Sequence, residues 1–187
     1  MIETPRLILR EWIESDLEPF TQLCADERVR EHFPSTLDRE QSAEWATRIG
    51  DHFRQHGFGF WAVECRAGAP FIGYLGLNTV SFEAHFTPAV EIGWGFARQA
   101  WGQGYATEAA RAVLGFGFET LALAEIVSFT VPANVRSWAL MERIGMRRDR
   151  AGDFDHPSLA KGHPLGGHVL YRVEARGWRA LPGSRAR

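Results

Sequence analysis

Hydrophobic and polar positions along this chain of 187 residues alternate between the two periods that distinguish strands from helices. Short runs rich in β-branched and aromatic residues predict strands, and apolar residues three or four positions apart predict helices. The expected strands span residues 6–12, 58–65, 70–80, 90–96, 126–131, 146–149 and 169–174. The expected helices span residues 14–25, 37–55, 106–121 and 137–144.

The order of these elements predicts the fold class. Strands bracket a few helices, which indicates an α+β fold with a mixed sheet. A Gly-, Pro- and His-rich stretch at 152–167 predicts a long loop. Because no repeat or domain boundary is evident, residues 1–178 are expected to form a single domain, with 179–187 as a flexible tail.

Two glycines, Gly102 and Gly104, stand between the expected strand 90–96 and the expected helix 106–121. Glycine allows the backbone to turn tightly and to approach a ligand. The helix N-terminus that follows offers unpaired N–H groups and the positive end of a helix dipole. This arrangement predicts a site for phosphate oxygens.

Two common phosphate-binding motifs do not fit these residues. A P-loop would need Lys and Ser or Thr after the second glycine, where the chain has Tyr105 and Ala106. A dinucleotide fingerprint would need Gly at the position of Thr107. The remaining pattern, Gln-x-x-Gly-x-Gly from Gln99 onward, indicates another class of phosphate ligand.

Composition and charge exclude several classes of protein. A net charge of −2 argues against general affinity for nucleic acid or for an anionic membrane. The chain is charged from Glu3 onward and has no apolar run of membrane-spanning length, which predicts a cytoplasmic protein without a leader. Two cysteines do not make a disulfide framework, so Cys24 and Cys65 are expected to be buried thiols in a reducing compartment.

Histidines in the predicted loop raise the question of a metal. His156, His163 and His168 stand near Asp153 and Asp155. Their spacings fit no recognised ligand pattern, so no metal is expected. Solvated loop positions or contacts with a substrate are the expected roles.

Three groups of residues occur in the order and spacing of one known family. They are Thr4-Pro5-Arg6-Leu7-Ile8-Leu9-Arg10 with Asp16-Leu17, then Glu91-Ile92-Gly93-Trp94 with Trp101-Gly102-Gln103-Gly104-Tyr105-Ala106-Thr107-Glu108-Ala109, then Asn134-Val135-Arg136-Ser137 with Ile144-Gly145-Met146. The pattern resembles the GNAT superfamily of acetyltransferases, in its ribosomal-protein N-terminal (Rim-type) branch, over roughly residues 2–175. The resemblance implies a GNAT fold, with a mixed, mostly antiparallel, twisted sheet flanked by helices.

The resemblance also implies acetyl-CoA as the co-substrate. Its pyrophosphate is expected on the glycine turn, and its pantetheine arm along the strand that ends at Phe96, whose N–H would support the oxyanion. The expected contacts are Trp94, Gly95, Phe96, Gln99, Gly102, Gln103, Gly104, Tyr105, Ala106, Thr107, Asn134 and Ser137. Gly93 and Gly95 suit a bulged or splayed strand; alternatively they only make room for Trp94 and Trp101 in the core.

Two residues are expected to carry the chemistry of direct attack in a ternary complex. Glu91 lies in a strand that should be largely buried, which favours a general base over its alternative, an ion pair with an arginine. Ser137 is expected to open a helix as its N-cap and to protonate the leaving thiolate. Relatives often use a tyrosine as the acid, but none of Tyr74, Tyr105 and Tyr171 stands at that position.

The acceptor is expected to be a primary amine, and a protein N-terminal α-amine is the favoured case. An α-amine with a pKa of ~8 needs only a modest base, whereas a lysine amine near ~10.4 needs a stronger one. Small-molecule amines (amino acids, polyamines, antibiotics) and a non-catalytic CoA-binding regulatory module remain alternatives. Contacts with the acceptor are expected from His32, Phe33, Glu83 and His85. Because relatives are often dimers, the resemblance also makes a homodimer possible for this chain.

Overall fold

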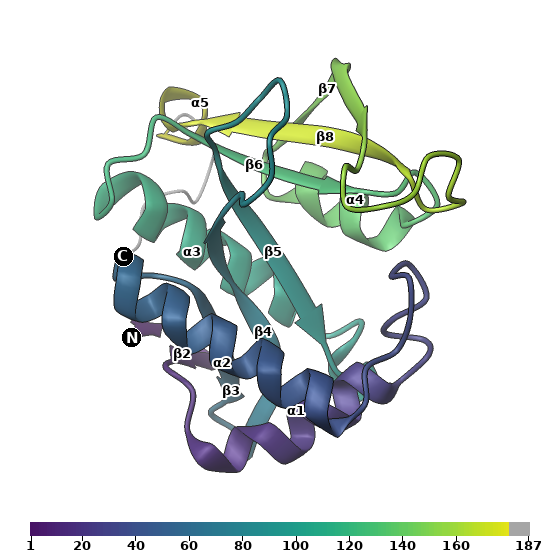
Figure 1. The fold of residues 1–187 in the computed structure, drawn as a ribbon. Coiled ribbons are helices and arrows are strands. Elements are labelled where there is room, and N and C mark those ends of the chain that lie inside the picture. The colour runs from purple at the N-terminus through teal and green to yellow at the C-terminus, as the bar shows by residue number, and fades with distance from the viewer. Residues whose placement is uncertain (180–187) are drawn as a thin grey trace. The chain divides into compact units, whose positions relative to one another are not determined.

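The computed structural model describes residues 1–179 (Figure 1). Its strands are β1 (Ile2–Glu3), β2 (Leu7–Arg10), β3 (Phe60–Cys65), β4 (Ala69–Thr79), β5 (Val90–Phe96), β6 (Glu125–Thr130), β7 (Arg147–Asp155) and β8 (Gly167–Glu174). Its helices are α1 (Leu17–Ala25), α2 (Arg39–His56), α3 (Tyr105–Glu119), α4 (Val135–Arg143) and α5 (Ala175–Arg179), with 3₁₀ turns η1 (Glu14–Asp16) and η2 (Arg98–Ala100).

The strands form an eight-stranded sheet in the order β1-β2-β3-β4-β5-β6-β8-β7. Neighbours from β1 to β4, and the pairs β6/β8 and β7/β8, run antiparallel, whereas β5 and β6 run parallel. The predicted mixed α+β fold with a mostly antiparallel sheet and flanking helices is therefore confirmed. Within residues 1–179, no helix is both long enough and apolar enough to cross a bilayer.

The chain divides into two compact units that each take two stretches of sequence. Unit 1 comprises Met1–Asn78 and Gly93–Val113, and unit 2 comprises Thr79–Ile92 and the chain from Leu114 onward. The expectation of one domain over 1–178 stays a prediction. The predicted tail 179–187 lies outside the described residues, apart from Arg179 at the end of α5.

An aromatic core holds unit 1 together. The helices α1 and α2 pack against β3 and β4 (Figure 1), as expected for amphipathic helices covering a sheet face. Phe20 of α1 lies at the centre, with its ring 4.8 Å from that of Trp12 and 5.9 Å from that of Tyr74. The buried residues of this core are Phe20, Leu23, Cys24, Ile49, Ala62, Phe71 and Tyr74.

A largely buried ion pair between Arg10 and Asp16 lies in the same unit. Arg10 donates to both carboxylate oxygens of Asp16, at 2.7 and 2.9 Å, and to Glu64 at 2.8 Å. Asp16 is only 1% exposed. Its hydrogen bonds raise the pKa of the Arg10 guanidinium. Arg10 and Asp16, both part of the first family-like motif, are therefore structural residues.

Unit 2 contains a second aromatic core. It joins the segment between β4 and β5 to the strands β6, β7 and β8. Its members are Val80, Phe86, Val127 and Leu170, with Phe82, Ala84, Ala89, Phe129 and Phe154 packed against them.

The predicted loop at 152–167 is wrong in its first part. β7 continues to Asp155, where Phe154 pairs with His168 and Asp155 with Gly167. The register shifts between Asp149 and Phe154. β7 is an edge strand with a polar sequence, so it has no alternation of buried and exposed residues from which a strand could be predicted.

Candidate functional site

The glycine turn between β5 and α3 has the geometry of an anion site. Gly102 and Gly104 have φ angles of +74° and +79°, which side-chain-bearing residues rarely adopt. Both glycines and Gln103 are exposed. The N–H of Glu108 bonds the carbonyl of Gly104 at 3.1 Å and closes the first turn of α3. The N–H groups from Tyr105 to Thr107 precede that bond and have no partner inside the helix.

Side chains of the turn hold its backbone in place. The Trp101 indole N–H donates to the Phe96 carbonyl at 2.8 Å, and the Gln103 side-chain amide donates to the Gln99 carbonyl at 2.7 Å. Gln103 therefore stabilises the turn through its side chain. Its role as a ligand contact stays a prediction.

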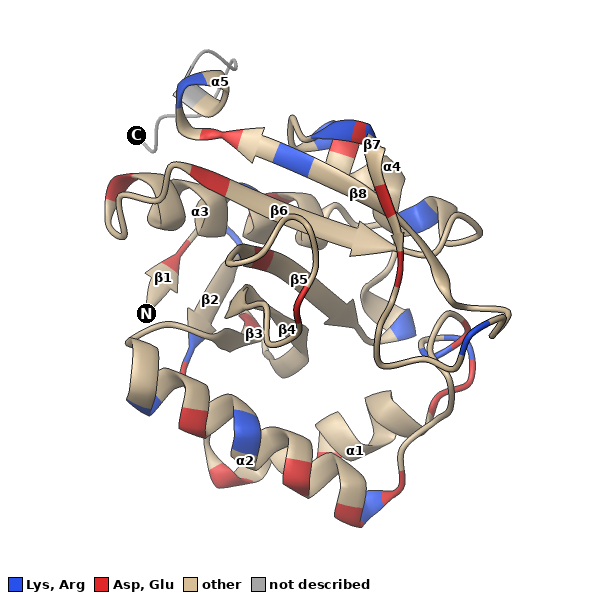
Figure 2. Ribbon diagram, turned by 45° about the horizontal axis from the view of Figure 1, so that its top comes forward, with Lys and Arg blue, Asp and Glu red and all other residues tan. Residues whose placement is uncertain are grey.

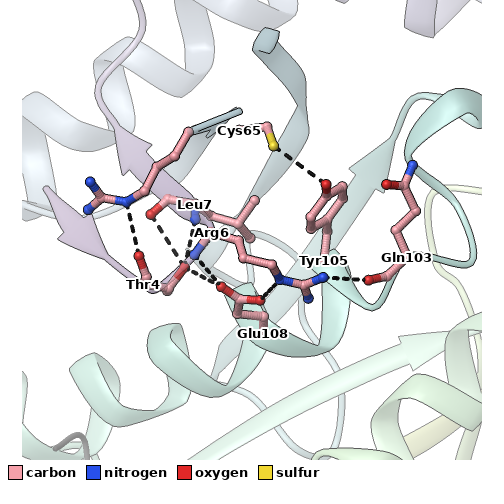
Figure 3. Close-up of polar contacts among 8 residues, drawn as sticks. Thr4, Arg6, Leu7, Cys65, Gln103, Tyr105 and Glu108 are labelled. Atoms are coloured by element: carbon pink, nitrogen blue, oxygen red, sulfur yellow. Dashed lines mark hydrogen bonds and ion pairs between the residues drawn. The ribbon is translucent and has the colours of Figure 1, made fainter. Parts of the chain in front are cut away.

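Residues from the start of the chain brace the same turn (Figure 3). The Arg6 guanidinium donates to the Gln103 carbonyl at 2.9 Å and to Glu108 Oε2 at 2.6 Å. It also lies over the Tyr105 ring, 4.7 Å from its centroid. Thr4 Oγ1 donates to Glu108 Oε1 at 2.7 Å. Arg6 thus contacts Gln103 in the glycine turn, and Tyr105 and Glu108 in the first turn of α3.

These contacts also set the charge balance beside the turn. Burial raises the pKa of Glu108, but hydrogen bonds from Thr4 and from the backbone and guanidinium of Arg6 outweigh it, so the pKa is lowered overall. Glu108 is therefore ionised at neutral pH. Because Arg6 is paired with it, the carboxylate does not stand alone next to a site for anions.

The sequence pattern named Thr4, Arg6 and Glu108 as motif members but assigned them no role. Their signal was their presence in two motifs that lie about a hundred residues apart in sequence. Only the pairing of Arg6 with Glu108 in space shows what they do together.

The segment of β5 that carries Trp94, Gly95 and Phe96 lies beside β4 in unit 1, and the Ala97 N–H bonds the Ile72 carbonyl at 2.9 Å. A Cβ atom at residue 95 would lie 2.7 Å from the Tyr74 hydroxyl oxygen and closer still to its ring. Gly95 therefore makes room for Tyr74, which is only 4% exposed, and not for the tryptophans. Sequence reasoning missed Tyr74 because nothing in the sequence shows which aromatic side chain faces a strand glycine.

Glu91 lies in unit 2, at the start of the same strand. It is half-buried and pairs with Val127 in the parallel ladder between β5 and β6. The next residue, Ile92, accepts a hydrogen bond from Ser128 Oγ at 2.9 Å. The backbone around Glu91 is therefore well fixed, and its role as a general base stays a prediction.

The prediction that Ser137 opens a helix is wrong. α4 begins at Val135, and Asn134 is its N-cap, with Oδ1 accepting the Ser137 N–H at 3.3 Å. The Asn134 amide also donates to Thr130 Oγ1 at 3.0 Å, which fixes the cap to the end of β6. Ser137 is half-buried at the third helical position, and its hydroxyl makes no hydrogen bond with any residue of the described chain. That hydroxyl is accordingly available to a ligand.

This difference has a measurable consequence for stability. We expect Asn134→Ala to lower the free energy of unfolding by about 1 kcal/mol, the usual effect of losing an N-cap. Ser137→Ala should change it by less than about 0.5 kcal/mol, as for a substitution without a structural partner. Urea unfolding of both variants tests the assignment, and a larger loss for Ser137→Ala would contradict it.

The histidines of the predicted loop are largely packed and do not gather around a metal position. The His156 and His168 rings lie 5.1 Å apart and contact Phe129 and Phe154. Burial lowers the pKa of each, so both are neutral at neutral pH. His163 accepts the Leu165 N–H at 3.0 Å. Across residues 1–179, no group of three or more His, Cys, Asp and Glu side chains is placed to hold a metal ion.

The cysteines are free and buried, as predicted. Burial raises the pKa of Cys24. Cys65 Sγ lies 3.5 Å from the Tyr105 hydroxyl, so this thiol packs under the glycine turn (Figure 3). Of the predicted acceptor contacts, Glu83 and His85 are exposed, and His32 and Phe33 lie between α1 and α2.

Comparison with known proteins places the chain in a family. Residues 6–147 match the model of the acetyltransferase (GNAT) domain, so the chain belongs to the GNAT acetyltransferases. The Bacillus subtilis protein described as the uncharacterized N-acetyltransferase YnaD is 28% identical over 95% of this chain and 98% of its own. A GNAT-family acetyltransferase structure from Bacillus anthracis is 25% identical, covers 94% of this chain and 98% of its own, and superposes with a TM-score of 0.77.

The same fold occurs in two structures that contain CoA or a CoA derivative. Mycobacterium smegmatis RimJ in complex with CoA-disulfide is 18% identical, with a TM-score of 0.74 over 95% of this chain and 85% of its own. Spermidine N-acetyltransferase from Vibrio cholerae, in complex with CoA and spermine, is 17% identical. It superposes with a TM-score of 0.73 over 93% of this chain and 98% of its own. The protein is thus an acetyl-CoA-dependent N-acetyltransferase, and the comparisons leave its acceptor amine open.

Proposed function

We propose that this enzyme acetylates protein N-terminal α-amines, as in the Rim-type branch of the family. The observation that carries the cofactor half of the proposal is the glycine turn, with two positive φ angles, exposed glycines and a free helix N-terminus. The likeness in fold to RimJ supports the acceptor half. The likeness to a spermidine N-acetyltransferase supports the main alternative, a small-molecule amine.

In this proposal the backbone from Gly102 to Thr107 holds the pyrophosphate of acetyl-CoA. The N–H groups from Tyr105 to Thr107 and the helix dipole would act on its charge together. The segment from Trp94 to Phe96 pairs with the pantetheine arm, and Asn134 and Ser137 contact it further along. Gln99 contributes through the carbonyl that holds Gln103.

The chemical step is a direct attack of the amine on the thioester carbonyl. Glu91 accepts a proton from the amine, directly or through water, as the C–N bond forms. The backbone N–H near Phe96 stabilises the oxyanion. The C–S bond then breaks, and the thiolate takes a proton from the unbonded hydroxyl of Ser137, which regains one from water while Glu91 releases to water the proton that it took from the amine. Since a thiol has a pKa of only ~8.5, a weak acid suffices for that last step.

An acceptor panel tests the function. The enzyme is supplied with acetyl-CoA and, in turn, peptides with a free N-terminus, the same peptides with a blocked N-terminus and a free lysine, spermidine, an aminoglycoside and free amino acids. We expect the highest kcat/KM for the free N-terminus, with mass spectrometry placing the acetyl group on the α-nitrogen. A preference for spermidine or for the lysine amine would contradict the proposal.

A further inference from the structure

One arginine in unit 1 is half-buried without an acidic partner. Arg30 lies in the connection between α1 and α2, residues 26–38 (Figure 1). Its Nε donates to the Ser35 carbonyl at 3.0 Å. Its guanidinium lies over the Phe33 ring, 4.0 Å from the centroid, and 5.7 Å from the Trp45 ring. It thus lies next to two aromatic side chains.

Within the described chain, no carboxylate pairs with Arg30. Burial lowers its pKa, and the groups that act against this effect are Tyr74 and Cys24, neither of which is a carboxylic acid. Arginines of α2 differ in this respect, because Arg39 pairs with Glu18 and Arg54 with Asp51. Figure 2 shows both acidic and basic residues along that helix.

A half-buried guanidinium that has no carboxylate partner can still form charge-assisted hydrogen bonds with an anion that reaches it. Glu27 and Glu31 of the same connection are exposed, and in the described chain neither forms an ion pair with Arg30. Phe33 beside it is 39% exposed, so the guanidinium lies next to a ring that a ligand can reach. An anionic ligand could therefore pair with the guanidinium and contact this ring.

A row of aromatic side chains leads from Arg30 to β5. The Trp45 ring lies 5.2 Å from the Tyr74 ring, and the Tyr74 hydroxyl lies 2.7 Å from where a Cβ of Gly95 would be. Phe60, with its ring 5.6 Å from that of Tyr74, flanks the row. All of these residues belong to unit 1. Arg30 therefore stands at one end of a row whose other end is the strand proposed to hold the acetyl group.

We infer that Arg30 binds a carboxylate of the acceptor, an acidic side chain close to the N-terminus of a peptide. This inference rests on the proposed function, because it places the reacting amine near Gly95. Two aromatic rings separate Gly95 from Arg30, which is more than the distance between amine and carboxylate in one amino acid. An extended peptide advances ~3.3 Å per residue, so its second to fourth residue reaches Arg30.

Matched peptides test the inference. Each pair differs only by Asp or Asn at the second, third or fourth position, which leaves the size of the side chain and the α-amine unchanged. With the wild type, we expect kcat/KM to be about tenfold higher for Asp at one of these positions, in line with hydrogen bonds to charged groups. In Arg30→Gln the ratio should fall to within about twofold, because kcat/KM falls more for the Asp peptide than for the Asn peptide, while affinity for acetyl-CoA stays unchanged.

Two further variants separate recognition from structure. Arg28→Gln is the matched control, because Arg28 is an exposed arginine of the same connection, and it should keep the wild-type ratio. Arg30→Lys keeps the charge without the planar fork, and should keep part of the preference for Asp. This second variant also gives a result if Arg30→Gln does not fold.

Several outcomes would overturn the inference. Equal kcat/KM for Asp and Asn peptides in the wild type would do so while leaving the proposed function intact. An equal loss for both peptides in Arg30→Gln would reduce Arg30 to a structural residue of the connection. If the ratio of kcat/KM for free glutamate over free glutamine exceeds the ratio for Asp over Asn peptides, the acceptor bound by Arg30 would be a free amino acid and not a peptide. Failure of every peptide, with turnover of spermidine, would overturn the proposed function as well.

Discussion

Gly104→Glu should abolish measurable binding of acetyl-CoA while the protein stays folded. The substitution places a carboxylate at the exposed turn that is proposed to hold the pyrophosphate, with a φ of +79° that disfavours any side chain. Like charges brought together in a binding site cost several kcal/mol. We therefore expect the Kd for acetyl-CoA to rise by at least about 100-fold, as measured by calorimetric titration.

The control for this prediction is Gly57→Glu. Gly57 has a similar φ of +75° and is also exposed, but it ends α2 far along the sequence from the turn. Both variants should lose similar stability, because each forces a side chain into the left-handed region at a cost of about 1–2 kcal/mol. Only Gly104→Glu should lose the ligand. Equal affinity in both variants would remove the glycine turn from the cofactor site.

Glu91→Gln should lower kcat by about 100-fold without changing the Kd for acetyl-CoA, as expected for loss of a general base. Gln keeps the shape of the side chain and removes its ability to accept a proton. The strand around Glu91 is fixed by its pairing with Val127 and by the Ser128 bond to Ile92, so the backbone should not move. Steady-state kinetics with a peptide acceptor give the measurement.

The pH dependence of this loss distinguishes a base from a structural ion pair. An α-amine with a pKa of ~8 becomes neutral as pH rises, so it needs the base less at high pH. The ratio of wild-type to Glu91→Gln kcat should therefore shrink between pH 7 and 9.5. A constant ratio, accompanied by a lower free energy of unfolding, would instead make Glu91 a structural residue. The exposed Glu119→Gln serves as the control with no expected effect.

Much of the fold could be predicted because its elements have strong local signals. Helix α2 begins with the Asp38 side chain accepting the Gln41 N–H at 2.9 Å and ends at Gly57 in the left-handed conformation, both of which are recognisable in sequence. The strands β3 and β4 were likewise predicted, at 58–65 and 70–80, and they pair antiparallel in the structure. Very short elements, such as β1 with two residues and α5 with five, do not contain enough residues to show a period.

Predictions about the site succeeded where a local pattern decides the backbone and failed where spatial neighbours decide it. The turn at Gly102 and Gly104 was predicted because only glycine favours its φ angles. Two good capping residues, Asn134 and Ser137, stand three positions apart, and propensity alone did not choose between them. The positions of Tyr74 beside Gly95 and of Arg30 among aromatic rings depend on contacts between distant segments, which a single sequence does not show.

The contacts between Arg6 and Glu108 connect the start of the chain to the glycine turn, so hydrogen exchange at Arg6 should depend on whether a ligand occupies the turn. The Arg6 N–H donates to Glu108 Oε1 at 2.9 Å, so this amide can exchange with solvent only when the bridge opens. A ligand that stabilises the turn must, by thermodynamic linkage, also stabilise this attachment. Slower hydrogen exchange at the Arg6 amide on addition of acetyl-CoA would therefore report, from the start of the chain, that the glycine turn is occupied.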